Sequence, residues 1–166
     1  MANEEAKYDV VKSNEIYEIR KYSDRLAVQA LNTNQNNSFR KLFNYISGDN
    51  ETNEEIKMTI PVTQMEKKGN MTMQFYLPSK FNKDNVPNPS RPDVEIVNIE
   101  GGYYAVIRYS GRASDKNFIK HKEILENELK KDNISIASPA IKASYNSPFT
   151  LPMLRRNEAM FKVNWK

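Results

Sequence analysis

The chain of 166 residues contains no cysteine and only one histidine, His121. Without thiols it can form neither disulfides nor thiolate metal sites, and thiol catalysis is excluded as well. A single histidine excludes sites that need two, such as the His-Glu-x-x-His zinc motif. The sequence also lacks a glycine-rich phosphate loop between a strand and a helix, and no serine is set in a nucleophile motif. The common hydrolytic and nucleotide-dependent chemistries therefore have no support.

Long apolar runs are missing too. No run approaches the roughly 18 residues needed to span a membrane, and the first residues lack the apolar segment of a signal peptide. The net charge is only +4, and acidic residues are interspersed with basic ones, so no basic stripe follows a phosphate backbone. We therefore expect a cytoplasmic protein with no membrane span and no nucleic-acid partner, and we favour a monomer.

What the sequence does contain is aromatic side chains: nine tyrosines, seven phenylalanines and one tryptophan. This content and length predict one folded domain over residues 1–166, with residues 1–6 flexible. Runs of β-branched and aromatic residues, several with apolar–polar alternation, indicate strands. The expected strands are 8–12, 16–22, 26–31, 56–65, 71–77, 94–99, 103–109, 140–145 and 159–165.

Two amphipathic helices are predicted from apolar residues spaced by three and four. The first is expected to be capped by Asn37 or Ser38 and stopped by Gly48, and the second to run from Ser114 or Asp115 to about residue 131. Each half of the chain then reads strand pair, helix, strand pair, over residues 15–77 and 94–165. The fold class is α+β: an antiparallel sheet closed toward a barrel, with two helices packed outside and a groove where the halves meet.

Two details of this prediction depend on local signals. Gly101-Gly102 lies between strands 94–99 and 103–109, and it predicts a hairpin that joins them. His121 lies at the border of the second helix, where a histidine is more often half-exposed or hydrogen-bonded than a metal ligand.

The segment from Tyr145 to Glu158 is an unusual loop. Two prolines, Pro148 and Pro152, forbid a regular helix or a central strand, yet the segment carries several large apolar side chains. Alone, such a loop favours a structural clasp over the core; the alternative is a surface that covers a ligand. The following Arg155-Arg156 could bind carboxylates of a ligand or pair with Glu158, and the sequence leaves both open.

Three segments in order resemble the SOUL haem-binding family, which also contains the p22 haem-binding protein. They are Tyr17-Glu18-Ile19-Arg20-Lys21-Tyr22; residues 39–62, with Ile56-Lys57-Met58-Thr59-Ile60-Pro61-Val62 at the end; and the loop 145–158. The resemblance covers residues 8–165. It implies a gyrase-inhibitor-like fold: a distorted antiparallel barrel of two halves related by a pseudo-twofold axis, with two flanking helices.

The resemblance also implies non-covalent binding of haem or a related tetrapyrrole in a shallow apolar cleft between the first helix and the loop. The matching positions are Phe39, Phe43, Tyr145 and Phe149, and we add Arg40, Leu151 and Met153 from their positions in the sequence. Lys21 stands where a family member has the histidine proposed to ligate iron. Because lysine ligates iron only when deprotonated, the resemblance implies binding by apolar packing rather than through that residue.

The implied role is binding, buffering or transport of a tetrapyrrole, without catalysis. Two alternatives stay open. The chain could be an effector-type binding module for another flat hydrophobic small molecule, or an enzyme that modifies tetrapyrroles, which we rank lowest. A fold of this kind does not decide among them.

Overall fold

The computed structural model describes residues 3–31, 35–67 and 69–166. The chain divides into two compact units: unit 1 contains residues 1–6 and 24–100, and unit 2 contains residues 7–23 and 101–166. Along the chain the elements are β1 (Glu4–Glu5), β2 (Tyr8–Ser13), β3 (Glu18–Tyr22), β4 (Arg25–Leu31), α1 (Gln35–Ile46), β5 (Thr59–Ile60), β6 (Val62–Lys67), β7 (Asn70–Tyr76), β8 (Val94–Ile99), β9 (Gly102–Tyr109), α2 (Asp115–Lys131), β10 (Ile141–Ser144), the 3-10 helix η1 (Pro152–Leu154) and β11 (Asn157–Val163).

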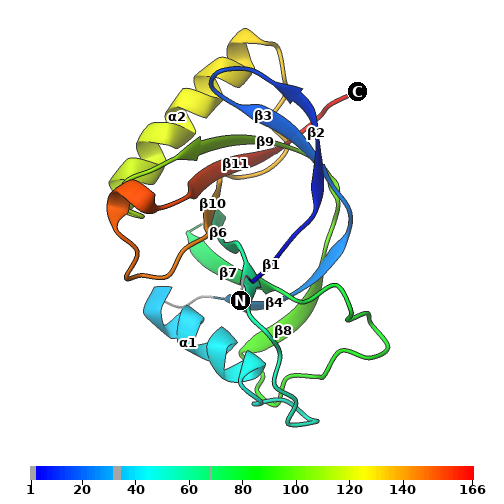
Figure 1. Ribbon diagram of the computed structural model, residues 1–166. Helices are drawn as coiled ribbons and strands as arrows, with labels where there is room; N and C mark the ends of the chain where they lie inside the picture. The colour runs from blue at the N-terminus through cyan, green and yellow to red at the C-terminus, as the bar shows by residue number, and fades with distance from the viewer. Residues whose placement is uncertain (1–2, 32–34, 68) are drawn as a thin grey trace. The chain divides into compact units, whose positions relative to one another are not determined.

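Unit 1 is an antiparallel sheet in the order β6-β7-β4-β8, with α1 packed against it (Figure 1). The apolar stripe of α1 supplies Leu42 and Ile46, which are buried against alternate side chains of the strands. The core cluster consists of Val28, Ala30, Leu42, Tyr45, Ile46, Ile56, Met73, Phe75, Leu77 and Val94. The short strand β1 pairs in parallel with β5, so the residues just after the N-terminus form part of this unit.

Unit 2 repeats this arrangement with different strands. Its sheet has the order β2-β3-β9-β11-β10, and all neighbours are antiparallel. Helix α2 contacts β9 and β11 and covers one face of the sheet with Leu125 and Leu129 (Figure 1). The core cluster consists of Tyr17, Ile19, Ala105, Ile107, Tyr109, Leu125, Leu129, Ala159, Phe161 and Val163. One face of this sheet is therefore apolar and covered by α2.

The predicted hairpin between residues 94–99 and 103–109 is wrong. β8 pairs with β4 in unit 1, with Arg25 opposite Ile99, whereas β9 pairs with β3 in unit 2. β3 and β4, which are also joined by a short connection, belong to different units as well. The glycine pair predicted a turn. Which strands pair with each other, however, depends on which sheet buries the apolar face of each strand. Both short connections carry the chain from one unit to the other.

The two helix starts differ in how well the sequence predicted them. Ser114 caps α2 as expected, because its hydroxyl accepts a hydrogen bond from the backbone N–H of Asn117. The cap predicted for α1 is wrong, since the helix already begins at Gln35 and both Asn37 and Ser38 lie inside it. Ser38 is fully buried there, so an N-cap-type residue occupies a core-facing helical position.

The predicted α+β class, the antiparallel pairing and the two helices are confirmed. Pro61 follows a cis peptide bond and separates β5 from β6, so the single strand expected over residues 56–65 is divided in two and begins only at Thr59. Over residues 3–31, 35–67 and 69–166, no helix combines the length and the apolar character needed to cross a membrane.

Candidate functional site

The predicted binding residues fall into two groups. Phe39, Arg40 and Phe43 lie on α1 in unit 1. Tyr145, Phe149, Leu151 and Met153 lie in unit 2, between the end of β10 and the start of β11. Each group is built by its own unit.

The outer side of α1 carries an exposed aromatic pair. Leu42 and Ile46 point into the core, whereas Phe39 and Phe43 are 41% and 49% exposed. The two rings stack with their centroids 6.1 Å apart and an angle of 12° between their planes. Phe39 is anchored by an edge contact to the buried Phe75, at 5.2 Å between centroids. Helical spacing of four residues places the pair on one stripe, and Arg40 is exposed beside it.

A pocket of about 720 Å³ opens in unit 1 next to this pair. Its apolar wall includes Phe43, Ile46, Ile56, Met58 and Pro78. Its other lining residues are mainly polar: Asn3, Glu4, Ser47, Glu55, Lys57, Ser79 and Lys80. A backbone hydrogen bond from Ser79 N–H to the carboxylate of Glu4, 2.9 Å long, ties β1 to this rim. The volume lies within the range of about 300–1,000 Å³ that is common for small-molecule sites.

The second group lies on the apolar loop, defined here as residues 147–155. Phe149, Leu151, Met153 and Leu154 are all exposed, and Phe149 is 94% exposed. The backbone of the loop is nevertheless fixed. Thr150 donates to the carbonyl of Ser147 at 3.1 Å, and Gly111 donates to the carbonyl of Pro152 at 2.9 Å. The loop therefore holds apolar side chains in solvent, and it is not a clasp over the core of unit 2.

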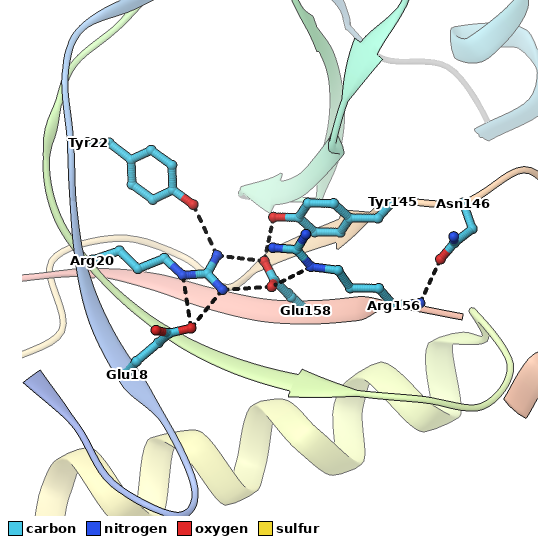
Figure 2. Close-up of polar contacts among 7 residues, drawn as sticks. All are labelled: Glu18, Arg20, Tyr22, Tyr145, Asn146, Arg156 and Glu158. Carbon is cyan, nitrogen blue, oxygen red and sulfur yellow. Dashed lines mark hydrogen bonds and ion pairs between the residues drawn. The ribbon is translucent and has the colours of Figure 1, made fainter. Parts of the chain in front are cut away.

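Beneath the base of the loop, the sheet face opposite α2 carries a buried ion pair (Figure 2). Both Arg20 of β3 and Glu158 of β11 are fully buried. Two nitrogens of the Arg20 guanidinium donate to the two carboxylate oxygens of Glu158, each at 2.8 Å. Such a bidentate arrangement satisfies both charges at once. Glu18 and Tyr22, which precede and follow Arg20 on the same strand face, also accept hydrogen bonds from it.

Glu158 has two further partners that flank the apolar loop, Tyr145 and Arg156. The Tyr145 hydroxyl donates to its Oε1, and the Arg156 guanidinium donates to its Oε2 at 3.2 Å. Arg156 also lies over the Tyr145 ring, 3.8 Å from the centroid, and its backbone N–H donates to Asn146 Oδ1 at 2.6 Å (Figure 2). One carboxylate thus connects β3 to both ends of the loop, which explains why the loop leaves and re-enters the sheet in a fixed way.

The electrostatics of this cluster favour its charged form. Burial opposes ionisation of Glu158, but the hydrogen bonds and the charge of Arg20, with smaller contributions from Tyr145 and Arg156, hold its pKa below the ordinary value. Burial and the neighbouring Glu158 raise the pKa of Tyr145, so the phenol stays protonated and acts as a donor. Burial lowers the pKa of Arg20, but Glu158 outweighs it and the net shift is upward. Arg20, Glu158 and Tyr145 therefore form a network in which the buried charges compensate each other.

The structure resolves the two roles left open for the paired arginines. Arg156 pairs with Glu158, as one alternative had it. Arg155 turns the other way, and its Nη1 donates to the carbonyl of Ser147 at 2.8 Å, across the mouth of the loop. Both guanidiniums therefore hold the loop in shape.

Two other residues singled out from the sequence have simple surroundings. Lys21 is exposed, with its ammonium 5.8 Å from the centroid of the Tyr103 ring. The His121 ring stacks on Tyr109 at 4.0 Å, and its Nδ1 lies 2.8 Å from the carbonyl oxygen of Asn117 on the preceding turn. His121 is thus half-buried and hydrogen-bonded on α2, the more common role for a histidine at a helix border.

Sequence reasoning missed Arg20 and Glu158 as a pair, and it missed the pocket in unit 1. A signal for the pair was present, since each is a charged residue on a strand whose other face is apolar. Which of several such charges are partners depends on sheet register, and residues 20 and 158 are far apart in sequence. The pocket has no sequence signal, because its lining comes from four separate segments.

Comparison with known proteins shows to which family the chain belongs. The sequence model of the family described as SOUL heme-binding protein matches residues 3–162. The chain belongs to this family. It is 30% identical over 164 residues to heme-binding protein 2 from Mus musculus, and the match covers 89% of this chain and 77% of that protein. The predicted family membership is confirmed.

Solved structures share the fold at much lower identity. The C-terminal domain of EcmrR superposes with a TM-score of 0.66 at 11% identity, and the match covers 96% of this chain and 99% of that one. A hydrolase from Listeria innocua gives a TM-score of 0.64 at 8% identity, with 93% and 94% of the two chains covered. At such identities the likeness shows the fold alone.

Proposed function

We propose that the protein binds haem or a related tetrapyrrole without covalent attachment, in a shallow apolar site that includes the outer face of α1. The observation that carries the proposal is the exposed, stacked pair Phe39–Phe43 on a helix whose other large apolar residues are buried. A flat aromatic macrocycle gains both apolar burial and ring stacking on such a surface. Membership of the SOUL heme-binding family supports this class of ligand.

Charged groups around this surface suit the carboxylates of a haem-like ligand. Arg40 is exposed on the same helix, and Lys57 and Lys80 stand on the rim of the adjoining pocket. A guanidinium or an ammonium donates charge-assisted hydrogen bonds to a carboxylate, and the geometry is forked for arginine. We assign Arg40 as the first partner of a propionate, because it lies beside the aromatic pair.

The proposed contacts in unit 2 remain Phe149, Leu151 and Met153 on the apolar loop, with Tyr145 just before it. Three of these side chains are exposed, and the loop that carries them has a fixed backbone, which lowers the entropy lost on binding. Tyr145 would act differently, since its ring lies under Arg156 and its hydroxyl is used by Glu158. We assign it the role of positioning the loop.

The proposed role is binding, buffering or transport, with apolar packing as the main source of affinity. Lys21, at the position of the family's proposed iron ligand, carries an exposed ammonium that must lose its proton to ligate iron. Haem and iron-free protoporphyrin are therefore expected to bind with similar affinity, since neither depends on an iron–protein bond.

Absorption titration tests the proposal. Addition of haemin to the wild-type protein should give a saturable change in the Soret band. Phe39→Ser with Phe43→Ser should weaken binding by at least about tenfold, because each buried aromatic ring contributes roughly 1.5–3 kcal/mol. Ile119→Ser is the matched control, since Ile119 is an exposed apolar residue on α2.

Three results would count against the proposal. The first is the absence of a saturable Soret change in the wild-type protein. The second is an equal loss of affinity in the Ile119→Ser control. The third is equally tight binding, in a fluorescence competition assay, of flat hydrophobic compounds unrelated to porphyrins; this would favour the effector-type binding module instead.

A further inference from the structure

The apolar loop exposes Leu154 in addition to the three side chains that the proposed function uses. Phe149, Met153 and Leu154 are 94%, 78% and 67% exposed, and Leu151 is exposed between them. Single exposed apolar side chains are normal on a protein surface, but four within six residues form a contiguous patch, which is typical of an interaction site. Leu154 was not among the predicted binding residues, and the proposed function gives it no role.

The loop holds this patch in a defined conformation. Leu154 N–H donates to the carbonyl of Leu151 at 2.9 Å and closes the 3-10 turn η1. The Arg155 guanidinium bonds the carbonyl of Ser147 and joins the two ends of the loop. Because these contacts fix the backbone, the apolar side chains are exposed in the folded conformation of the loop and not through local unfolding.

The surroundings of the patch are basic. Gly111 donates to the carbonyl of Pro152, and this contact brings η1 beside the segment that leads into α2 (Figure 1). Arg112 in that segment and Lys116 and Lys120 on α2 are exposed. The acidic residue of the first turn, Asp115, is paired with Lys142 at 3.4 Å. The positive end of the α2 dipole adds to the local potential.

We propose that the apolar loop docks on the surface of an anionic lipid bilayer. Phe149, Leu151, Met153 and Leu154 would enter the boundary between headgroups and acyl chains, and Arg112, Lys116 and Lys120 would face anionic headgroups. Apolar insertion to a depth of roughly 5–10 Å together with basic flanking charge is how proteins bind at a membrane interface without spanning it. A protein partner would need an acidic rim around an apolar groove, whereas an anionic bilayer offers both properties over its whole surface.

This inference does not depend on the proposed function, because it requires no tetrapyrrole. Phe149, Leu151 and Met153 are shared with the predicted cleft, whereas Leu154, Arg112 and Lys116 lie outside it. The two sites can therefore be separated by mutation. Leu154→Ser removes an apolar contact from the loop, and Arg112→Glu with Lys116→Glu reverses the basic charge. Phe39→Ser with Phe43→Ser, on α1, should leave lipid binding unchanged.

Co-sedimentation with vesicles tests the inference. Without haem, the wild-type protein should pellet with vesicles of phosphatidylcholine and phosphatidylserine, and much less with phosphatidylcholine alone. Leu154→Ser should lower the partition coefficient by about tenfold, since a buried leucine contributes about that factor or more. The double charge reversal should lower it by more than about tenfold at low salt, and the difference should shrink as salt rises.

Val10→Ser is the matched control, because Val10 is an exposed apolar residue on β2 in the same unit. The variants replace exposed side chains, and an unchanged thermal midpoint should show that they remain folded. The inference is overturned if the wild-type protein stays in the supernatant with anionic vesicles, or if Val10→Ser loses as much binding as Leu154→Ser. It is also overturned if Leu154→Ser abolishes self-association and leaves vesicle binding intact, since a second copy of the chain would then cover the loop.

Discussion

Unit 1 and unit 2 share one topology, β6-β7-β4-β8 around α1 and β10-β11-β9-β3 around α2, yet their polar chemistry differs. The sheet of unit 1 carries a row of hydrogen-bonded, uncharged side chains that ends at the carboxylate of Glu95. Gln74 donates to Gln29 at 2.9 Å, Gln29 donates to Glu95 at 2.6 Å, and Thr63 reaches Gln74 at 3.4 Å. In unit 2 the sheet face carries the fully buried pair of Arg20 and Glu158 instead.

The difference shows how one arrangement of strands tolerates two solutions for polar residues. When one side chain of the amide row is removed, the hydrogen bonds between the others can remain. A buried charge pair does not tolerate such a loss, because removal of one partner leaves an uncompensated charge in a low-dielectric environment. We therefore expect Arg20 and Glu158 in unit 2 to be more strongly coupled than the amide side chains in unit 1. Unit 1 instead carries the pocket and the exposed aromatic pair.

The largest expected effect comes from Arg20→Ala. The substitution leaves the Glu158 carboxylate buried without its bidentate partner, and we expect the free energy of unfolding to fall by about 3–5 kcal/mol. Urea unfolding followed by circular dichroism measures it. Arg40→Ala, at an exposed position on α1, should change stability by less than about 0.5 kcal/mol. A loss below about 1 kcal/mol for Arg20→Ala would show that Glu158 is neutral or reached by water.

A pair of core substitutions tests whether the units are assigned correctly. Leu42 and Leu125 are fully buried, one in each core, and each substitution to alanine should cost about 2–5 kcal/mol. Hydrogen exchange should then separate the units. Leu42→Ala should speed exchange in β8, and Leu125→Ala should speed it in β3, because local opening follows the weakened unit. Faster exchange in β9 rather than β8 after Leu42→Ala would contradict the strand pairing.

The pH dependence of stability should report on Glu158. Its pKa is lowered in the folded protein from an ordinary value of 4.5, so its contribution is present above that pH and is lost as pH falls toward the folded pKa. Glu158→Gln removes this proton uptake. The free energy of unfolding of the variant should therefore decline less steeply below about pH 4.5 than that of the wild type. Glu95→Gln, at an exposed carboxylate in unit 1, is the control, and equal slopes for all three proteins would refute the assignment.

The smallest effect is expected for a surface ion pair in unit 1. Lys41 and Asp93 lie 3.0 Å apart, and both are partly exposed. A double-mutant cycle with alanine should give a coupling energy of about 0.2–1 kcal/mol, which decreases with added salt. The coupling between Arg20 and Glu158 should be larger and nearly independent of salt. Equal salt dependence of both pairs would remove the contrast between the units.

The sequence was sufficient for those features that depend on local patterns. The spacing of Leu42 and Ile46 marked the buried stripe of α1, and Ser114 marked the start of α2, because helical periodicity and capping act within a few residues. The prolines of the loop likewise predicted an irregular segment. In each case the controlling interaction lies within a few residues of the signal.

Features that depend on distant partners could not be predicted. The Gly101-Gly102 pair suggested a hairpin, but β8 and β9 find their partners in different units. Arg156 had two equally good roles because Glu158, two residues away, is held in place by Arg20 of the distant strand β3. The family resemblance placed the aromatic pair of α1 at a cleft, whereas helical periodicity put it on one stripe with Leu42 and Ile46, because periodicity alone does not tell how wide a stripe the sheet covers.

The exchange of strands between the units has a consequence for synthesis on the ribosome. All strands of unit 1 have been made once residue 100 has left the exit tunnel, so this unit can fold first. β3 is made earlier, yet its partner β9 follows it by roughly 80 residues, from Tyr22 to Gly102. At about 5–20 residues per second this interval lasts several seconds. Throughout it β3 has only β2 beside it, and its other edge stays open to strands of neighbouring nascent chains.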